Sequence, residues 1–295
     1  MRWQNEAMSN VDPRVLSLAE DELLAAQEAA DVTVRELHDP HECADASLLL
    51  DEVWNVGQAG TTQMEASLLV ALAHSGNYVG GAYCNKTGDL IGVTVGFFGE
   101  PLGKMMHSHI AGVSHDQVGR GTGAAMKLHQ RLWCLNRGIH QMTWTFDPLI
   151  ARNAYFNFHR LGTVCLEYIE DFYGQMRDGV NEGQGSDRML VSWRLDRPAR
   201  VEPIEAEEDE VFHALAVNPD GTPEIADVPR TAPLVAVRIP SDIETLRGED
   251  AELAARWRVA LRDALTGLIA DGWEIVSCAR GGTYLLTHPE EEDVD

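Results

Sequence analysis

The sequence predicts an α/β fold in which one mixed, mostly antiparallel sheet carries helices on its faces, with a small C-terminal α+β extension. Strand-like and helix-like segments follow the order β-α-α-β-β-β-α-β-α-β-β over residues 32–196. Two of the strand segments flank the turn sequence NKTGD, which is typical of an antiparallel hairpin. A chain of 295 residues with 44% apolar residues can bury a core beneath such a sheet.

The first half of the chain is expected to form two helical layers around the strands. Apolar spacing and β-branched alternation predict a helix at 16–29, a strand at 32–37, helices at 41–55 and 64–76, and strands at 77–84, 90–99 and 105–113. A glycine-rich turn then opens a helix with one apolar stripe, formed by Ala125, Leu128, Leu132 and Leu135. After this helix we expect a strand at 141–147, a helix at 150–162, and strands at 164–174 and 188–196.

Composition shifts divide the chain into four regions. Residues 1–30 are an N-terminal helical segment, and 31–196 form the main domain. Residues 197–230 are acidic, contain prolines and lack periodicity, so we expect a linker. Residues 231–295 form a small α+β unit with an acidic tail, in which Ser241 and Glu244 make a capping box before one long helix.

Charge and cysteine usage exclude several classes of partner. The chain has 23 Lys plus Arg against 47 Asp plus Glu, a formal charge of −24 that repels nucleic acid and anionic lipid. Five cysteines lie far apart without a C-x-x-C pair, which favours reduced thiols. The N-terminus is polar and no segment approaches 18 apolar residues, so we expect a cytoplasmic protein with neither a nucleic-acid nor a membrane partner.

The three alternating glycines Gly119, Gly121 and Gly123 precede a helix and predict a phosphate-binding turn. Amides at a helix N-terminus lack intrahelical partners, and the helix dipole adds positive charge. A P-loop is excluded because Ala124 and Ala125 stand where Lys and Ser or Thr would be needed. A glycine turn that merely starts the helix, with no ligand, is the structural alternative.

A dinucleotide-binding turn is a second alternative for the same glycines. Gly119, Gly121 and Ala124 match G-x-G-x-x-G/A, and Asp147 lies where a ribose partner could follow the next strand. That motif begins directly after a strand in a parallel sheet, whereas here the sequence SHDQV intervenes and a hairpin comes before it. The dinucleotide alternative is therefore the weaker one.

Three motifs together resemble the GCN5-related N-acetyltransferase (GNAT) superfamily, in a bacterial branch with a C-terminal extension. They are HSHIAGV at 107–113, QVGRGTGAAMK at 117–127 and TWTFDPLIARNAYFNFHRLG at 143–162, within a similar region of 31–196. The resemblance implies transfer of an acyl group from acetyl-CoA, or another acyl-CoA, that lies between the strands at 105–113 and 141–147. Val118 departs from the family's usual Arg or Gln, and Arg120 is the expected charged partner.

The cofactor-binding residues expected from this resemblance lie on the strand, on the glycine turn and on the later helix. They are Ala111, Gly112, Val113, Val118, Gly119, Arg120, Gly121, Thr122, Gly123, Ala124, Asn153 and Phe156. An amide near Gly112 or Val113 is expected to stabilise the carbonyl oxygen.

Candidate catalytic side chains follow from the proton transfers that amide formation needs. His109 is the expected base, since His107 and His109 share one face of a strand and histidine accepts protons near neutral pH. Structural histidines, or a metal site built on them, are alternatives, and we expect no metal. Asp147 is a second base candidate. Phe158 occupies the family's usual tyrosine position, so Tyr155, or else His159, is expected to be the acid.

The sequence thus predicts an acyl-CoA-dependent N-acetyltransferase whose partner is a small-molecule or amino-acid-like amine. A non-catalytic acyl-CoA-binding or sensing module is the alternative, because the usual tyrosine is absent. A Rossmann-type dinucleotide-binding protein is less favoured. We also expect the C-terminal unit to contribute to the acceptor site or to a homodimer interface.

Overall fold

The computed structural model describes residues 11–56, 62–174, 185–198 and 210–288, which form two compact units. Of these residues, the first unit contains those up to Trp144 together with 194–198. The second contains the described parts of 145–193 and 210–288. The boundary between the units therefore falls within the predicted domain 31–196, after Trp144. The described residues from 145 to 193 belong to the same unit as the C-terminal residues.

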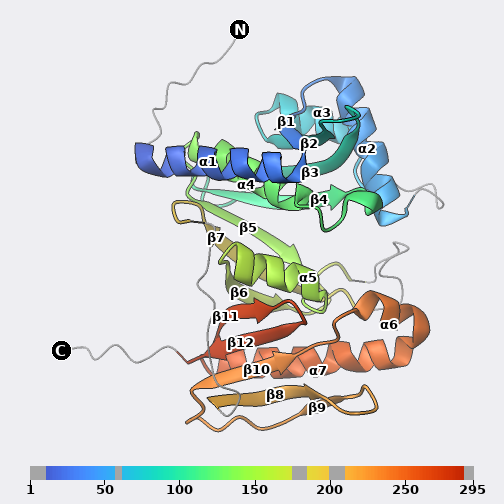
Figure 1. Cartoon of the computed structure of the whole chain (residues 1–295), viewed down its shortest axis with the longest axis vertical. Coiled ribbons are helices and arrows are strands. Elements are labelled where there is room, and N and C mark those ends of the chain that lie inside the picture. The colour runs from blue at the N-terminus through green and yellow to red at the C-terminus, as the bar shows by residue number, and fades with distance from the viewer. Residues whose placement is uncertain (1–10, 57–61, 175–184, 199–209, 289–295) are drawn as a thin grey trace. The chain divides into compact units, whose positions relative to one another are not determined.

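The first unit is a sheet with helices on both faces (Figure 1). Its elements are α1 (Pro13–Ala30), β1 (Val32–Glu36), α2 (Pro40–Trp54), α3 (Ala66–His74), β2 (Tyr78–Cys84), β3 (Leu90–Phe98), β4 (Met105–Val113), α4 (Thr122–Leu135) and most of β5 (Gln141–Phe146). The strand order is β1-β2-β3-β4-β5. The first three neighbouring pairs are antiparallel and β4 and β5 are parallel, which confirms the predicted mixed, mostly antiparallel sheet.

Two apolar layers hold the helices of this unit to the sheet. On one face, Leu50 of α2 and Leu69 of α3 pack with Val93 and Ile110 of the sheet. On the other face, Met126 of α4 packs with strands β1 to β3, and α1 packs along α4. The sheet is consequently buried on both sides, which explains its long apolar strands.

Helix α4 is buried around almost its whole circumference, and not only along its predicted stripe. The residues on its polar side, Lys127, Gln130, Arg131 and Cys134, are buried as well. Arg131 donates hydrogen bonds to the carbonyl oxygens of Leu195 and Arg197 at 2.8 Å and pairs with Glu22 of α1. Protein groups therefore supply the partners of Arg131 on the polar side of α4.

The second unit combines the end of the predicted main domain with the C-terminal residues. Its elements are α5 (Ala151–Ala154), a π-helical segment (Tyr155–Arg160), β6 (Val164–Ile169), β7 (Arg188–Arg194, whose last residue belongs to the first unit), β8 (Val211–Val217), β9 (Pro223–Ile225), β10 (Leu234–Arg238), α6 (Ile243–Glu249), α7 (Ala251–Ala270), β11 (Glu274–Ala279) and β12 (Thr283–Thr287). β6 and β7 are antiparallel. A five-stranded sheet has the order β11-β12-β10-β8-β9, with β10 and β8 parallel (Figure 1).

Several sequence predictions for this region are wrong. The predicted linker 197–230 contains strands β8 and β9 of the five-stranded sheet, so the α+β unit begins before residue 231. Asp242, and not Ser241, caps α6 by accepting a hydrogen bond from the Thr245 amide. The predicted long helix is two helices, because Asp250 ends α6 and caps α7. Residues 199–209 and the tail 289–295 lie outside the described residues.

The two parts of the second unit share one core. Phe158 of the π-helical segment is fully buried against Phe146 and against Tyr284 of β12, with ring centroids 6.2 and 5.9 Å apart. The Tyr284 hydroxyl donates to the Pro148 carbonyl oxygen at 2.6 Å. The C-terminal strands therefore supply part of the packing around the predicted helix 150–162.

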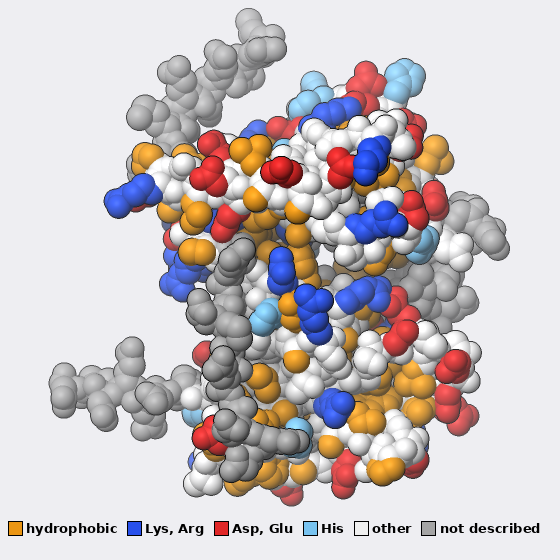
Figure 2. Space-filling model, viewed as in Figure 1, with side chains coloured by type: hydrophobic (Ala, Val, Ile, Leu, Met, Phe, Trp, Pro, Cys, Tyr) orange, Lys and Arg blue, Asp and Glu red, His pale blue; other side chains and the backbone are white. Residues whose placement is uncertain are grey.

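Acidic and basic side chains are mixed on the face of the molecule that Figure 2 shows. Figure 2 shows acidic side chains scattered over the visible face of each unit, interspersed with Lys and Arg. None of the described helices is long and apolar enough to cross a membrane.

Candidate functional site

Strands β4 and β5 separate after a short parallel ladder. Their pairing covers Met105 to His107 of β4 and Gln141 to Thr143 of β5. β4 continues to Val113, so its residues 108–113 have no partner on the β5 side among the paired strands described. We call the point after His107 and Thr143 the fork.

The register of β4 decides which amides face its open edge. Ser114 donates its amide hydrogen to the Ile91 carbonyl oxygen at 2.9 Å. Antiparallel pairs alternate between bonded and non-bonded, so Gly112, opposite Val93, also turns its amide toward β3. The amides of Ala111 and Val113 therefore point to the open edge. Of the two predicted oxygen-stabilising amides, that of Val113 faces the open edge and that of Gly112 does not.

Gly112 has a packing role instead. A Cβ at this position would lie 2.5 Å from the Trp54 ring, so only glycine lets the end of α2 approach β4 this closely. Close helix packing therefore accounts for glycine at residue 112, and contact between its backbone and the cofactor stays a prediction.

The glycine turn presents a row of amides at the start of α4. A short 3₁₀ turn at His115–Gln117 separates it from β4, and Gly119 and Gly121 have φ values of 80° and 96°. The amides of Gly119, Gly121, Thr122 and Gly123 have no hydrogen-bond acceptor within the described part of the chain. Because no side chain caps α4, these donors and the helix dipole remain available to an anion.

The space and charge around the turn also suit an anion. A Cβ at Gly119 or Gly123 would meet no atom within 4 Å, so both positions face open space. Val118 is exposed and brings no charge. Arg120 is exposed and interacts electrostatically with Lys86 and Asp116, so it can supply the charge that Val118 lacks.

His107 and His109 lie beside each other on β4, as predicted, with Phe97 between them. Their ring centroids are 6.5 Å apart, and each lies within 5.6 Å of the Phe97 centroid. The ladder with β3 shifts register opposite His109, while buried and more exposed residues keep alternating along β4. His109 is exposed, while His107 contacts the Thr143 hydroxyl at 3.2 Å.

Both histidines are neutral at pH 7. Burial lowers the pKa of His107 to about 4, with further contributions from His109 and Lys127. Burial also lowers the pKa of His109. A neutral imidazole can accept a proton, so His109 keeps the property required of a base. No group of three or more metal-ligating side chains is found among the described residues.

Sequence reasoning missed a polar cluster beneath the fork. Lys127 of α4 donates a hydrogen bond from Nζ to the Ser108 hydroxyl at 2.7 Å, and Nζ lies 4.0 Å from the centre of the Trp144 ring. Ser108 in turn donates to the Gln130 side-chain oxygen at 3.0 Å. We call these four residues the apex cluster, because Ser108 and Trp144 are the first residues beyond the ladder on their strands.

Lys127 has no carboxylate partner among the described residues. Burial lowers the pKa of its ammonium group to about 7. Helical spacing could have hinted at the cluster, since residues 127, 130, 131 and 134 share one side of α4. The sequence does not reveal that this side is buried.

The prediction of Asp147 as a base is wrong. Arg258 donates to its two carboxylate oxygens at 2.6 and 2.8 Å, and Arg247 donates to one of them at 2.7 Å. Burial alone would raise the pKa of Asp147, but the hydrogen bonds and charges of the two arginines outweigh it and hold the pKa far below its usual range. The carboxylate is fully buried and cannot take up a proton near neutral pH.

Tyr155 lies in a different helical geometry from the one predicted. Residues 151–154 are α-helical and 155–160 are π-helical. Tyr155 stacks on His159 with ring centroids 4.8 Å apart, and the Arg280 guanidinium lies 4.9 Å from the Tyr155 ring centre. The two candidate acids therefore contact each other and a cation from the turn between β11 and β12.

The remaining expected cofactor residues, Asn153 and Phe156, are half-buried in the second unit. Phe158, at the usual tyrosine position, has no exposed surface. The fork, the glycine turn and His109 belong to the first unit, and Asp147, Asn153, Tyr155 and Phe156 to the second.

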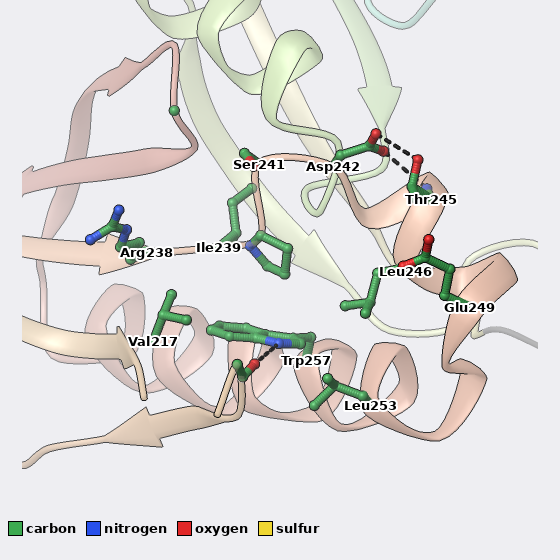
Figure 3. A pocket seen from close by; sticks show the side chains of 13 residues that line it. Val217, Arg238, Ile239, Ser241, Asp242, Thr245, Leu246, Glu249, Leu253 and Trp257 are labelled. Atoms are coloured by element: carbon green, nitrogen blue, oxygen red, sulfur yellow. Dashed lines mark hydrogen bonds between the residues drawn. The ribbon is translucent and has the colours of Figure 1, made fainter. Parts of the chain in front are cut away.

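The second unit has a cavity of its own, of about 590 Å³, between β10, α6 and α7. Figure 3 shows the Trp257 ring along one wall, with Leu246 and Leu253 beside it. Asp242 and Thr245 on the rim bond to each other at the start of α6 (Figure 3). None of the predicted site residues lines this cavity, and its described lining has no His, Cys, Lys or Tyr.

Solved structures similar to this chain include several acetyltransferases. One is yncA of Salmonella typhimurium, solved with its cofactor acetyl-CoA, at 19% identity, with 59% of this chain and 99% of that chain covered and a TM-score of 0.44. Another is a GNAT-family acetyltransferase of Streptococcus pneumoniae, at 14% identity, 55% and 99% coverage and a TM-score of 0.45. A third is the ribosomal-protein-S18-alanine N-acetyltransferase of Escherichia coli, at 11% identity, 60% and 99% coverage and a TM-score of 0.40.

No protein-family model matches the sequence, and no curated protein matches it. The solved structures that the chain resembles thus include members of the GNAT family, the same family that the motifs within residues 31–196 resemble.

Proposed function

We propose that the chain binds an acyl-coenzyme A and transfers its acyl group to the amine of a small-molecule or amino-acid-like acceptor. One observation carries the proposal: the open edge of β4 leads directly into a row of unpaired amides at the start of α4. A ligand with an amide-containing arm and a pyrophosphate group fits this arrangement. The arm can pair with the backbone groups of the strand edge, and the pyrophosphate can accept hydrogen bonds from the amides of the turn.

The residues of the first unit fit the parts of such a ligand. The amides of Gly121, Thr122 and Gly123 would hold the pyrophosphate, with Arg120 as the nearby cation. The open edge at Ala111 and Val113 would pair with the amides of the arm, as an added strand does. When bound, the coenzyme supplies a reactive thioester.

The length of β4 also fits. A pantetheine arm has about 13 bonds between phosphorus and sulfur, and an extended peptide has three backbone bonds per residue, so the arm spans about four strand residues. An arm that starts at Val113 and runs back along β4 for this length therefore ends beside His109, close to the fork.

The proposed chemistry uses neutral His109 to accept the proton that the attacking amine loses. The Val113 amide, which points to the open edge, lies at the pyrophosphate end of the arm, so it would bond an amide of the arm and not the carbonyl oxygen of the thioester. Asn153, Phe156 and Tyr155 remain proposed contributors from the second unit. The dispersed negative surface charge favours a cationic amine as acceptor.

A coenzyme-binding sensor without turnover is the second candidate. It is favoured by the complete burial of Phe158 at the position where the related enzymes carry a tyrosine. A dinucleotide-binding protein is not supported, because β4 and β5 are the one parallel pair among the paired strands described in the first unit, and Asp147 is held by arginines.

Titration calorimetry with acetyl-CoA and with NADH tests the ligand class. We expect acetyl-CoA to bind and NADH not to bind. Gly123→Asp should weaken the affinity for acetyl-CoA by at least a hundredfold, because a carboxylate at the start of the helix repels the pyrophosphate. The same carboxylate interacts favourably with the helix dipole, so the helix itself should not be destabilised. Gly123→Ala is the matched control and should fold normally, since its Cβ meets open space. Absence of acetyl-CoA binding to the unsubstituted protein would overturn the proposal.

Release of free coenzyme A with a panel of amines separates the enzyme from the sensor. Amine-dependent release supports the transferase, whereas tight binding without release supports the sensor. We also propose a cytoplasmic location, on the basis of the cysteine spacing, and a homodimer, which sedimentation measurements would test.

A further inference from the structure

The apex cluster holds a buried cation at the place where the proposed ligand arm ends. Its Lys127 side chain is more than nine-tenths buried. The Nζ atom lies close to the first residue of each strand beyond the β4–β5 ladder, 2.7 Å from the Ser108 hydroxyl and 4.0 Å from the Trp144 ring centre. Because β4 and β5 separate at these residues, Lys127 lies directly beneath the fork.

The cluster has more hydrogen-bond donors than acceptors. An ammonium group has three N–H donors. One is used by Ser108 and one side of the group faces the Trp144 ring, and no acceptor among the described residues is assigned to the third. The Gln130 side-chain nitrogen is also buried and has no partner among the described residues. Such a site favours a ligand group that carries negative charge or develops it during reaction.

The surrounding titratable groups leave the Lys127 charge uncompensated. Cys134 lies on the same helix, and His107 of β4 interacts with the ammonium group. The neighbouring cation Arg131 already pairs with Glu22 of α1. From β5, Trp144 contributes a ring and Thr143 a hydroxyl bound to His107. The ammonium group therefore loses its proton more readily than an exposed lysine does.

We propose that Lys127 is the proton donor to the thiolate that leaves when the acyl group is transferred. This rests on the proposed function. As the C–N bond to the acceptor forms and the C–S bond breaks, the electron pair of the C–S bond remains on sulfur and takes a proton from the Lys127 ammonium. His109 takes the proton that the acceptor nitrogen loses. Lys127 regains a proton from solvent before the next cycle.

This assignment replaces the acid that the sequence lacks at Phe158. It also gives a role to a buried lysine whose position costs folding free energy. A pKa near neutrality is the value at which an acid transfers a proton efficiently and is reprotonated between cycles.

The test measures the protonation of Lys127 directly. The sequence contains three lysines, Lys86, Lys104 and Lys127, so ¹³C-labelled lysine gives three Cε signals. Lys→Arg variants at the three positions assign them. Titration of the free protein should show Lys127 losing its proton near pH 7, while exposed Lys86, whose pKa is raised by its hydrogen bond to Asp31, stays protonated at that pH.

Coenzyme A and desulfo-coenzyme A are the two probes. Coenzyme A should raise the proton affinity of Lys127 by tenfold or more, because a thiolate next to the ammonium favours its charged form. Desulfo-coenzyme A should bind without this change. Lys104 serves as the internal control and should be unaffected by both probes.

The outcomes separate this inference from the proposed function. If coenzyme A does not bind, the proposed function fails and this inference fails with it. If both probes bind and shift Lys127 equally, or not at all, only the role of Lys127 is overturned.

Enzyme variants give a second, independent readout. In Lys127→Met, we expect acetyl-CoA binding within threefold of the unsubstituted value and a fall in kcat of about a hundredfold. The corresponding limb of the pH–rate profile should disappear, and Lys104→Met should behave as the unsubstituted protein. An unchanged kcat and pH profile in Lys127→Met would contradict the assignment.

Discussion

Asp147 of the second unit and Lys127 of the first are charged side chains that are buried in opposite settings. In the second unit, Asp147 receives three hydrogen bonds from Arg247 and Arg258, and Arg262 donates to both oxygens of Asp187 at 2.7 and 3.0 Å. In the first unit, Lys127 is buried with neutral partners only, Ser108 and the Trp144 ring.

The partners of a buried charged group decide whether it can exchange a proton near neutral pH. A buried carboxylate held by two arginines stays ionised at any physiological pH, so it can stabilise packing but cannot exchange protons. A buried ammonium without a carboxylate exchanges its proton near neutrality. Sequence position misleads here, because Asp147 ends a strand beside the predicted site and Lys127 lies within a helix.

Asp147→Asn should produce the largest effect. It leaves two buried arginines without a carboxylate, and we expect unfolding in urea to show a loss of about 3–5 kcal/mol. Because the folded pKa of Asp147 is lowered, its contribution is present above its unfolded pKa and is lost as the pH falls through the folded value. The variant should therefore lose part of the acid sensitivity of the unsubstituted protein. A loss below about 1 kcal/mol would show that the cluster is not structural.

Lys127→Met should change stability by an amount that depends on pH in the neutral to alkaline range. The folded pKa of Lys127 is about 7, so between this value and about 10.4 the unfolded chain binds more protons and the unsubstituted protein gains stability as the pH rises. The methionine variant removes this dependence. We expect its stability relative to the unsubstituted protein to fall by about 2–4 kcal/mol between pH 6 and pH 10.

Denaturation at several pH values measures this change, and Lys104→Met is the matched control for loss of a lysine. Parallel curves for the unsubstituted protein and Lys127→Met would show that Lys127 is protonated normally in the folded state.

Alanine substitutions in the glycine turn separate folding from ligand binding. Gly121→Ala should lose about 1–2 kcal/mol, since φ is 96° and the new Cβ would lie 3.4 Å from that of Ala30. Gly123→Ala should be neutral or stabilising, because its backbone is helical and its surroundings are open. Thermal unfolding measures both, and equal losses at the two positions would contradict this difference.

The smallest effect is expected at an exposed ion pair of the second unit. Arg152 pairs with Glu244, and both side chains are at least one-third exposed. Glu244→Gln should change stability by less than about 1 kcal/mol, because solvent screens exposed pairs. Denaturation under the conditions used for Asp147→Asn provides the direct comparison, and similar losses in the two variants would remove the distinction between buried and exposed pairs.

Local patterns predicted most elements because each pattern has a local physical cause. Alternation and turn residues located β2, β3 and β4, and the glycines located the start of α4. Local patterns failed for β8, a seven-residue apolar strand that directly follows an acidic run, and for β9, which has only three residues. They also failed at residues 155–160, where a π-helical segment replaces the expected α-helix.

The candidate site was predictable where backbone conformation determines it. Gly119 and Gly121 adopt positive φ values, and this requirement is visible as glycine in the sequence. The orientation of the Gly112 and Val113 amides depends on register with β3, which a single strand does not encode. The protonation of His109, Asp147 and Lys127 depends on neighbours distant in sequence.

The sequence by itself determined the succession of strands and helices, the glycine turn and the excess of negative charge, because these follow from residue type and local spacing. The tertiary structure alone decided that Asp147 is a clamped carboxylate, that Phe158 is fully buried, and that Lys127 lies beneath the fork. Burial and partners distant in sequence set the free energy of each ionised side chain. Neither its burial nor these partners can be predicted from the residues next to it in the sequence.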